Sequence, residues 1–203
     1  NRDAKTVTTA KGKTFEYDKL ILATGSFAFV PPIPGKDREH CLVYRTINDL
    51  HAIKNSAQAS KVGVVIGGGL LGLEAANALK QLGLQTHVIE FAPQLMGVQI
   101  DSAGGRLLKN KITELGVTVH TSVATEQIIE GENSRYKMCF KGGQTLETDM
   151  IVFSAGIRPY DNLAREFNLE IGERGGIVIN NHCQTSDKNI YAIGECALWN
   201  NFI

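Results

Sequence analysis

The segment Gly67-Gly68-Gly69-Leu70-Leu71-Gly72 lies directly after the apolar run Val62–Ile66 and directly before an alanine- and leucine-rich stretch at 74–82. The apolar run predicts a buried strand, and the later stretch predicts a helix that begins at about Leu70. A GxGxxG turn alone is weak evidence, but one placed between a strand and a helix indicates a dinucleotide-binding βαβ unit. This context favours a ligand site over the alternative, a helix that packs on a sheet through small residues.

The glycines of this turn have separate predicted roles, because each lacks a Cβ atom. Gly67 lets the chain leave the strand in a tight turn, Gly69 lets the backbone approach a pyrophosphate, and Gly72 lets the helix lie near the sheet. The helix N-terminus presents unsatisfied N–H groups and its positive dipole end to the same space, which favours phosphate. We therefore expect the pyrophosphate to be bound by Gly67, Gly68, Gly69, Leu70, Leu71 and Gly72.

An acidic residue follows at a suitable distance along the chain. The strand expected at 85–90 ends on Glu90, which lies 90 − 72 = 18 residues after the last glycine. This is close to the ~20-residue interval at which a carboxylate contacts the adenosine ribose. A carboxylate there repels a 2′-phosphate, and residues 91–94 include no Arg or Lys that could bind one. We expect NADH to be preferred over NADPH; the alternative is a solvated charge at a strand end.

Composition excludes several classes of function. The 203 residues carry 21 basic and 21 acidic side chains, so no basic excess points to nucleic acid or to an anionic membrane surface. No apolar run reaches the ~20 residues that a membrane-spanning helix needs. Four scattered cysteines without CxxC spacing favour reduced thiols in the cytoplasm, and the five histidines show no metal-ligand spacing. Because the chain starts at Asn1 and not at methionine, we interpret it as a piece of a longer protein.

Strands and helices alternate over the middle of the chain. Alternation of this kind predicts an α/β fold with a doubly wound parallel sheet. The expected elements are a helix at 46–56, a strand at 62–66, a helix at 70–82, a strand at 85–90, a helix at 105–115 and a strand at 117–121. Short strands within 125–147 then predict an antiparallel β-meander, and the apolar stretch 149–156 predicts a buried strand that returns to the parallel sheet.

The two ends of the chain do not show this regular alternation of strands and helices. We expect a hairpin over 7–17, a buried strand over 19–25, a proline-rich linker over 30–35, a short helix over 162–167 and strands over 177–179 and 189–195. The predicted domain divisions fall at 34/35 and 157/158, and the part between them, 35–157, is the predicted NADH-binding domain.

The FAD assignment comes from a resemblance. The strand ends Ala23-Thr24-Gly25 and Ile193-Gly194-Glu195 flank the nucleotide domain. This arrangement resembles two-dinucleotide flavoprotein reductases, in which an NADH domain is inserted into a discontinuous FAD domain. The resemblance implies a partial FAD-binding domain at 1–34 and a return to this partial FAD-binding domain at 158–203. The match narrows, over nearly the whole chain, to the large subunits of assimilatory NAD(P)H nitrite reductases. The strings that carry it are IGGGLLGLE at 66–74, HVIEFAPQLM at 87–96, FSAGIRP at 153–159 and IGECALW at 193–199.

The resemblance implies a set of flavin-side residues. Thr24 and Gly25 form a turn that closes over the FAD region in such proteins. The acid after Gly194 hydrogen-bonds the ribityl and pyrophosphate part of FAD, although the wider family has Gly-Asp where this chain has Gly194-Glu195. Hydride would pass from nicotinamide to flavin without an acid, base or nucleophile from the protein, so we assign no catalytic residue and no metal ligand.

Two further residues are placed near the nicotinamide. The resemblance puts Glu74, expected in the first turn of the helix, beside this ring. Gly156 is expected at the nicotinamide end because it ends a parallel strand on the edge of the sheet where ligands usually bind. A helix dipole alone also favours an acid in a first turn, and a turn glycine needs no ligand, so both alternatives stay open.

The resemblance also implies what this chain lacks. The GxGxxG that binds the FAD pyrophosphate is expected before Asn1, and ligands for sirohaem and an iron–sulfur cluster are expected beyond Ile203. The expected partners are NADH, the remaining FAD-domain segment and the reductase domains of the parent chain, so the piece itself is not expected to reduce nitrite. The alternatives are a fragment of a ferredoxin or rubredoxin reductase or of an NADH oxidase, or a non-catalytic NAD-binding module.

Overall fold

A computed structural model describes residues 1–201, and these form two compact units. The central unit comprises Ala28–Gly156, and the terminal unit comprises Asn1–Phe27 together with the chain from Ile157 onward. The units thus divide at 27/28 and 156/157, whereas the sequence pattern put the divisions at 34/35 and 157/158. Among the described residues, no helix is both long enough and apolar enough to cross a membrane.

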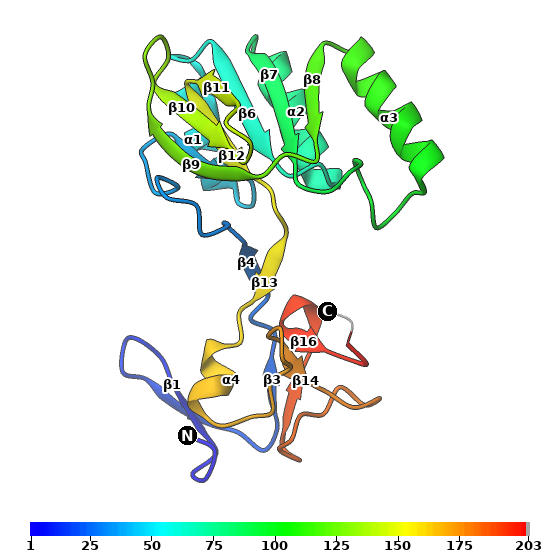
Figure 1. Cartoon of the computed structure of the whole chain (residues 1–203). Coiled ribbons are helices and arrows are strands. Elements are labelled where there is room, and N and C mark those ends of the chain that lie inside the picture. The colour runs from blue at the N-terminus through cyan, green and yellow to red at the C-terminus, as the bar shows by residue number, and fades with distance from the viewer. Residues whose placement is uncertain (202–203) are drawn as a thin grey trace. The chain divides into compact units, whose positions relative to one another are not determined.

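The central unit is built on a parallel sheet of five strands in the order β5-β12-β6-β7-β8 (Figure 1). Its strands are β5 (Cys41–Val43), β6 (Val62–Ile66), β7 (Gln85–Glu90), β8 (Val117–Thr121) and β12 (Met150–Phe153). Its helices are α1 (Ile47–Ala57), α2 (Leu70–Gln81) and α3 (Ser102–Glu114). The alternation expected from the sequence is confirmed, and β12 joins the sheet between β5 and β6. The short strand β5 was not predicted.

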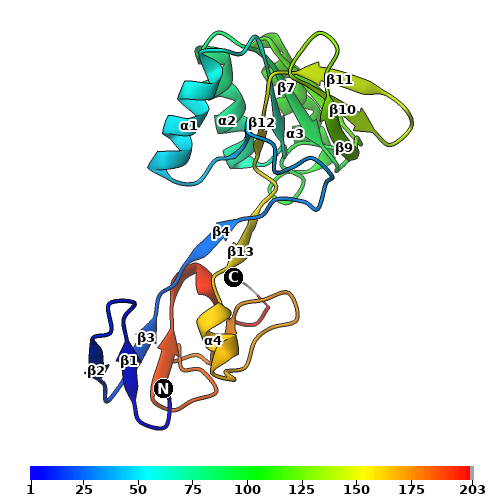
Figure 2. The ribbon, with the colours of Figure 1, turned by 90° about the vertical axis from the view of Figure 1, so that its left-hand side faces the viewer.

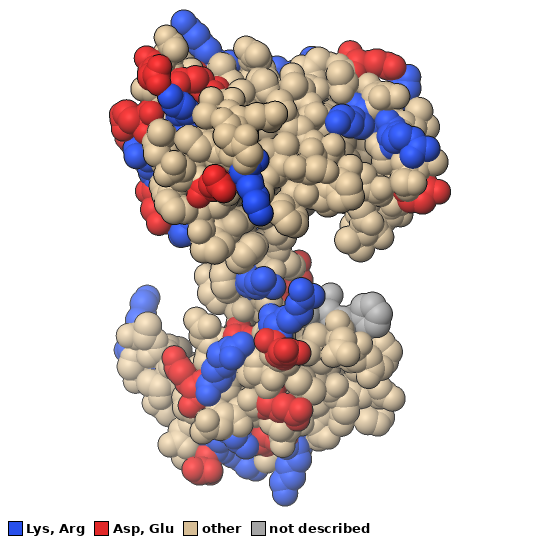
Figure 3. Space-filling view, viewed as in Figure 1, with Lys and Arg blue, Asp and Glu red and all other residues tan. Residues whose placement is uncertain are grey.

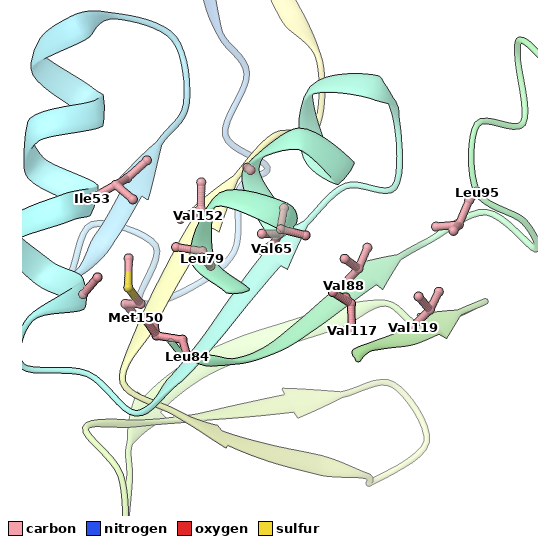
Figure 4. Close-up of a cluster of buried hydrophobic side chains, with 13 residues drawn as sticks. Ile53, Val65, Leu79, Leu84, Val88, Leu95, Val117, Val119, Met150 and Val152 are labelled. Carbon is pink, nitrogen blue, oxygen red and sulfur yellow. The ribbon is translucent and has the colours of Figure 1, made fainter. Parts of the chain in front are cut away.

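All three helices pack on the same face of the sheet. On this face, Leu79 of α2 is fully buried against Val65, Val88 and Val152 (Figure 4). The other face is covered by an antiparallel meander, as Figure 2 shows. Its strands are β9 (Thr125–Glu130), β10 (Tyr136–Phe140) and β11 (Thr145–Thr148). The expected meander is therefore confirmed, and it forms the third layer in place of helices. Strand β6 lies between both cores, which explains its unbroken apolar run.

Two details of the central unit correct the expectations. Helix α3 begins at Ser102, three residues earlier than predicted, because the Asp101 side chain accepts a hydrogen bond from Gly104 N at 2.8 Å and caps it. The proline-rich segment 30–35 is not a free linker. Ile33 is buried in the core under the meander, and Pro34 O accepts a hydrogen bond from Ile128 N at 2.8 Å. Prolines fix an extended chain, which can still pack against a strand.

The terminal unit consists of short paired segments. Its elements are β1 (Thr6–Thr8), β2 (Thr14–Glu16), β3 (Leu20–Leu22), β4 (Ser26–Ala28), β13 (Ile157–Pro159), α4 (Asn162–Glu166), β14 (Ile177–Val178), β15 (Ile190–Ala192), a 3₁₀ turn (Gly194–Cys196) and β16 (Ala197–Leu198). The hairpin β1–β2 is confirmed, and β3 pairs in parallel with β15. Strand β3 is not buried throughout as expected, because Ile21 is 60% exposed and β15 is its one partner among the described residues.

The face of the molecule drawn in Figure 3 shows no gathering of charges of one sign. On the face drawn in Figure 3, Lys and Arg are interspersed with Asp and Glu. This agrees with the 21 basic and 21 acidic residues of the chain.

Candidate dinucleotide site

Two glycines of the turn are required by the fold itself. Gly67 has φ +122°, and a Cβ atom there would lie 2.2 Å from the carbonyl oxygen of Ser154. A Cβ atom on Gly72 would lie 2.0 Å from the carbonyl oxygen of Gly67, so the first turn of α2 rests directly on the glycine turn. No side chain fits at either position, because backbone atoms occupy the space.

Gly69 is different. It is the N-cap residue of α2, with φ −82° and ψ −176°, an extended conformation that any residue adopts. A Cβ atom there would have no neighbour within 4 Å. Neither backbone strain nor packing within the described chain requires glycine here. The open space beside Gly69 is where a ligand could approach the protein backbone closely.

The N-terminus of α2 also lacks a cap. Helix α1 begins with a full capping box between Thr46 and Asp49, and α3 begins with the Asp101 cap. Helix α2 has neither a side-chain cap nor an acid in its first turn. The side-chain acceptors that satisfy the first-turn N–H groups of α1 and α3 are therefore missing where an anion would bind.

Glu90 closes the turn from the next strand. Its Oε2 accepts a hydrogen bond from Gly68 N at 2.6 Å, and its Oε1 accepts one from Ala92 N at 2.6 Å. A carboxylate has about four lone-pair sites, so about two remain for ribose hydroxyls. The contact needs a glycine at 68, because a Cβ atom there would lie 3.0 Å from Glu90 Oε2 and 2.5 Å from Leu95 Cδ2. Sequence reasoning gave Gly68 no separate role, since the contact joins residues 22 apart.

Two hollows, each of about 660 Å³, share Gly69 and Glu90 in their walls. The first is also lined by Gly67, Gly68 and Gly156, so these expected residues lie around one space. The second runs along the loop that follows β7. A carboxylate and an open helix N-terminus between two hollows suit a long ligand with a central diphosphate.

The remaining expected site residues of the central unit lie on α2 and just after β12. Leu70 and Leu71 lie in the first turn of α2 with exposed side chains. Glu74 is exposed and is the fifth residue of the helix, so the expectation that it lies in the first turn is wrong. Helix α2 begins at Leu70, as expected, so a residue four positions later lies in its second turn. Gly156 has φ +101° and open space around its Cα.

In the terminal unit, the flavin-side residues meet through β3 and β15. The register pairs Leu22 with Ala192, and Ile193 N donates to Leu22 O at 3.0 Å. Thr24-Gly25 and Gly194-Glu195 therefore follow neighbouring strand ends. Ser26 Oγ donates to Glu195 Oε2 at 2.9 Å, and the Thr24 hydroxyl donates to the carbonyl oxygen of Tyr160.

The structure also brings together a pair that the sequence pattern concealed. His87 Nδ1 and His120 Nε2 are 3.1 Å apart, although the two residues are 33 positions apart in the chain. The only sequence signal is that both lie in strands, and the pairing of those strands cannot be read from the spacing. Among residues 1–201, no group of three or more His, Cys, Asp or Glu side chains could hold a metal ion.

Comparison with known proteins agrees with this geometry. The family model for pyridine nucleotide-disulphide oxidoreductases matches residues 1–202. The chain is 59% identical, over all its 203 residues, to the nitrite reductase [NAD(P)H] large subunit of Klebsiella oxytoca, of which it covers 21%. It is 58% identical, over 99% of its length, to the nitrite reductase (NADH) large subunit of Escherichia coli, of which it covers 24%. The chain thus spans about a quarter or less of these relatives.

Solved structures show the same fold. The chain superposes on a ferredoxin reductase from Rhodopseudomonas palustris with a TM-score of 0.91 and 29% identity, over 98% of this chain and 49% of that one. A NAD-dependent persulfide reductase from A. fulgidus gives a TM-score of 0.90 and 32% identity, over 97% of this chain and 37% of that one. The expected α/β fold and the resemblance to nitrite reductase large subunits are both confirmed. The chain belongs to the pyridine nucleotide-disulphide oxidoreductase family.

Proposed function

We propose that this chain is the electron-input part of a flavoprotein nitrite reductase, in which NADH is bound by the central unit and FAD by the terminal unit. The observation that carries the NADH assignment is Gly69. It is a glycine that the described fold does not require, at an uncapped helix N-terminus, beside a carboxylate held by two backbone N–H groups. A diphosphate fits the first two features, and a ribose fits the third.

The residues of the central unit supply position and electrostatics. Gly67, Gly68, Gly69, Leu70, Leu71 and Gly72 would hold the pyrophosphate, Glu90 the adenosine ribose, and Glu74 and Gly156 would lie toward the nicotinamide. When both cofactors are bound, they supply the redox chemistry, with NADH as hydride donor and FAD as acceptor. No acid, base or nucleophile of the chain is needed for that step, so we assign no catalytic residue.

FAD binding is proposed for Thr24, Gly25, Gly194 and Glu195. Family membership supports it, as does the meeting of these residues at the ends of β3 and β15. Gly25 and Gly194 have φ +69° and +74° and open space around them, so the turns leave room for a ligand. Glu195 has its Oε2 hydrogen-bonded to Ser26, and a carboxylate has further lone pairs for a flavin hydroxyl.

The parent protein, we propose, reduces nitrite with sirohaem and an iron–sulfur cluster that lie outside this chain. The support is the identity of 59% to a nitrite reductase large subunit, against 36% to an NADH oxidase of Methanocaldococcus jannaschii. The rest of the parent chain would complete the FAD site and accept the electrons. A cytoplasmic location is proposed as well, supported by the four free cysteines.

The test is a titration of the chain with NADH and with NADPH, followed by nicotinamide fluorescence. NADH is expected to bind more tightly, and Glu90→Gln should reduce that preference because the amide does not repel a 2′-phosphate. Glu114→Gln is the matched control. It also removes one carboxylate, but from the exposed C-terminal end of α3, just before β8 begins. Glu114 therefore lies near the amino ends of the strands, whereas Glu90 lies at the carboxyl end of β7. Equal binding of both nucleotides by the unaltered chain would contradict the assignment of Glu90.

Flavin needs a separate measurement. The parent protein is expected to copurify with FAD, with a flavin absorption spectrum that NADH bleaches without air. A parent protein that binds NADH but holds no flavin would refute the electron-input function and support a nucleotide-binding module. A flavin that NADH reduces, in a protein that does not oxidise NADH with nitrite, would instead favour a ferredoxin reductase or an NADH oxidase.

A further inference from the structure

Two histidines join the last two strands of the central sheet. His87 lies on β7 and His120 on β8, with Nδ1 and Nε2 at 3.1 Å and with nearly parallel rings whose centroids are 5.4 Å apart. The other ring nitrogen of His87 faces the amide nitrogen of Gln85 at 3.4 Å. An amide donor there leaves His87 Nδ1 as the donor and His120 Nε2 as the acceptor. With both rings neutral, the pair forms a hydrogen-bonded bridge between β7 and β8.

This bridge joins β7 to the carboxyl end of β8, beside the backbone of Glu90. His120 directly precedes Thr121, whose register partner across the sheet is Glu90. The chain then continues along the loop after β7, where Ser122 N donates to Ala92 O at 2.9 Å and Val123 N donates to Glu90 O at 3.1 Å. The backbone at Glu90 and at Ala92, whose N–H binds the Glu90 carboxylate, is therefore held by the residues that follow β8.

The residue that follows β8 has a strained backbone. Ser122 has φ +59°, a left-handed conformation that costs about 1–2 kcal/mol for a residue other than glycine. Strand β8 is an edge strand, with β7 as its one partner in the described sheet. The bridge from His87 to His120 thus adds a side-chain contact where the backbone has neighbours on one side alone.

Acid weakens this bridge. Burial lowers the pKa of both imidazoles below the ordinary 6.5; the second cause is the His120 ring for the pKa of His87 and the Lys109 ammonium for that of His120. Lys109 comes from α3, and its Nζ donates to Oγ1 of Thr121, the residue after His120, at 3.2 Å. When both rings are protonated, N–H groups face each other at the bridge and two like charges lie beside a third.

We propose that the His87–His120 pair is a pH-sensitive clasp between β7 and β8 that positions Glu90 and thereby sets the affinity for a dinucleotide. The clasp is closed when both rings are neutral and opens on acidification. The inference rests on the proposed NADH site in the central unit. Because the pKa values are lower in the folded than in the unfolded chain, stability from the pair is present above the unfolded value and falls as pH drops below 6.5.

The probe is ADP-ribose, which carries the diphosphate and both riboses and avoids the acid lability of NADH. Its Kd is measured by calorimetry between about pH 7.5 and about pH 5.5, the range in which histidines titrate. We expect the Kd of the unaltered chain to rise about fivefold or more over this range, a typical size for coupling between sites. In His120→Gln the Kd should change little with pH, because glutamine still offers a hydrogen-bonding group but does not titrate.

His51→Gln is the control, since His51 is exposed on α1, which packs at the other end of the sheet. It should keep the pH dependence of the unaltered chain. His87→Gln provides a second test of the pair if His120→Gln folds poorly. A Kd that rises equally in the unaltered chain and in the His120→Gln or His87→Gln variant, or that does not rise at all, overturns the clasp.

Failure of the proposed NADH site gives a different result. A folded chain that binds no ADP-ribose at either pH refutes that site. In that case, amide hydrogen exchange in β8 is the measurement that tests the clasp. After correction for the intrinsic pH dependence, β8 amides should lose protection at the lower pH in the unaltered chain and less so in His120→Gln. Equal protection in both would overturn the clasp.

Discussion

Gly69→Ala is expected to leave the fold intact and to weaken dinucleotide binding. The residue has an extended backbone, φ −82° and ψ −176°, and no atom would lie within 4 Å of a new Cβ. Replacing glycine lowers the entropy of the unfolded chain, which stabilises by about 0.4–1 kcal/mol. Alanine is a poorer N-cap than glycine by an amount of about the same size. The two effects oppose each other, so the free energy of unfolding should change by less than about 1 kcal/mol.

Binding should respond much more strongly. The new methyl group stands in the space from which the diphosphate would reach the first-turn N–H groups of α2. Loss of one hydrogen bond to a charged group costs about 1.5–3 kcal/mol, which raises Kd about ten- to hundredfold. The assay is calorimetric titration with NADH, with urea unfolding of the same preparation as the measure of stability. A Gly69→Ala chain that binds NADH as tightly as the unaltered chain would refute the reasoning.

Gly72→Ala is the comparison that separates packing from binding. In an exposed helix this change stabilises by about 0.8–1.0 kcal/mol. Here the new Cβ would lie 2.0 Å from the carbonyl oxygen of Gly67, and overpacking of this kind costs about 1–3 kcal/mol or more. The variant should therefore unfold at lower urea concentration, in contrast to Gly69→Ala. If both variants lose stability equally, Gly69 has a structural role and its value as evidence for a ligand is lost.

Three further changes have defined outcomes. Gly68→Ala should displace the Glu90 carboxylate, because the Cβ would lie 3.0 Å from its Oε2, and paired titrations should show a smaller preference for NADH over NADPH. Leu79→Ala removes a fully buried side chain of α2 and should lower the free energy of unfolding by about 2–5 kcal/mol, measured with urea. Burial by itself raises the pKa of Asp149. The hydrogen bonds that its carboxylate accepts, first from Val62 N, have the larger effect and hold its pKa below the usual 3.8. Its contribution to stability is therefore present above pH 3.8 and lost on further acidification, so Asp149→Asn should be less stable at neutral pH and show a smaller loss in acid.

The sequence predicted the elements of the central unit well where periodicity and turn residues agree. The run at 62–66 and the glycines on both sides of α2 leave few alternatives, and Gly83 and Gly116 have the positive φ expected after helix ends. The strand at 41–43 was missed because three residues carry too little pattern. The burial expected for the strand at 19–25 was overestimated, since an apolar run does not show how many neighbouring strands the chain provides.

The side-chain contacts between neighbouring strands could not be predicted from one sequence. The spacing of Glu90 from the glycine turn indicated a site, but not that Gly68 N binds its carboxylate. The His87–His120 pair depends on the parallel register of β7 and β8, in which Ile89 and not His87 stands opposite His120. A shift of one residue would turn every side chain to the other face, so such pairs follow from register and not from composition.

The two cofactor assignments rest on different kinds of evidence, and the difference lies in what the chain satisfies by itself. In the terminal unit, Gly25 and Gly194 have positive φ, so backbone conformation already explains them, and the FAD assignment rests on the family. In the central unit, backbone conformation and packing require glycine at 67 and 72 but not at 69, and side-chain caps are present on α1 and α3 but not on α2. Departures from local rules are expected where function requires them. Both features occur at Gly69, which is why we propose the dinucleotide site from geometry as well as from the family.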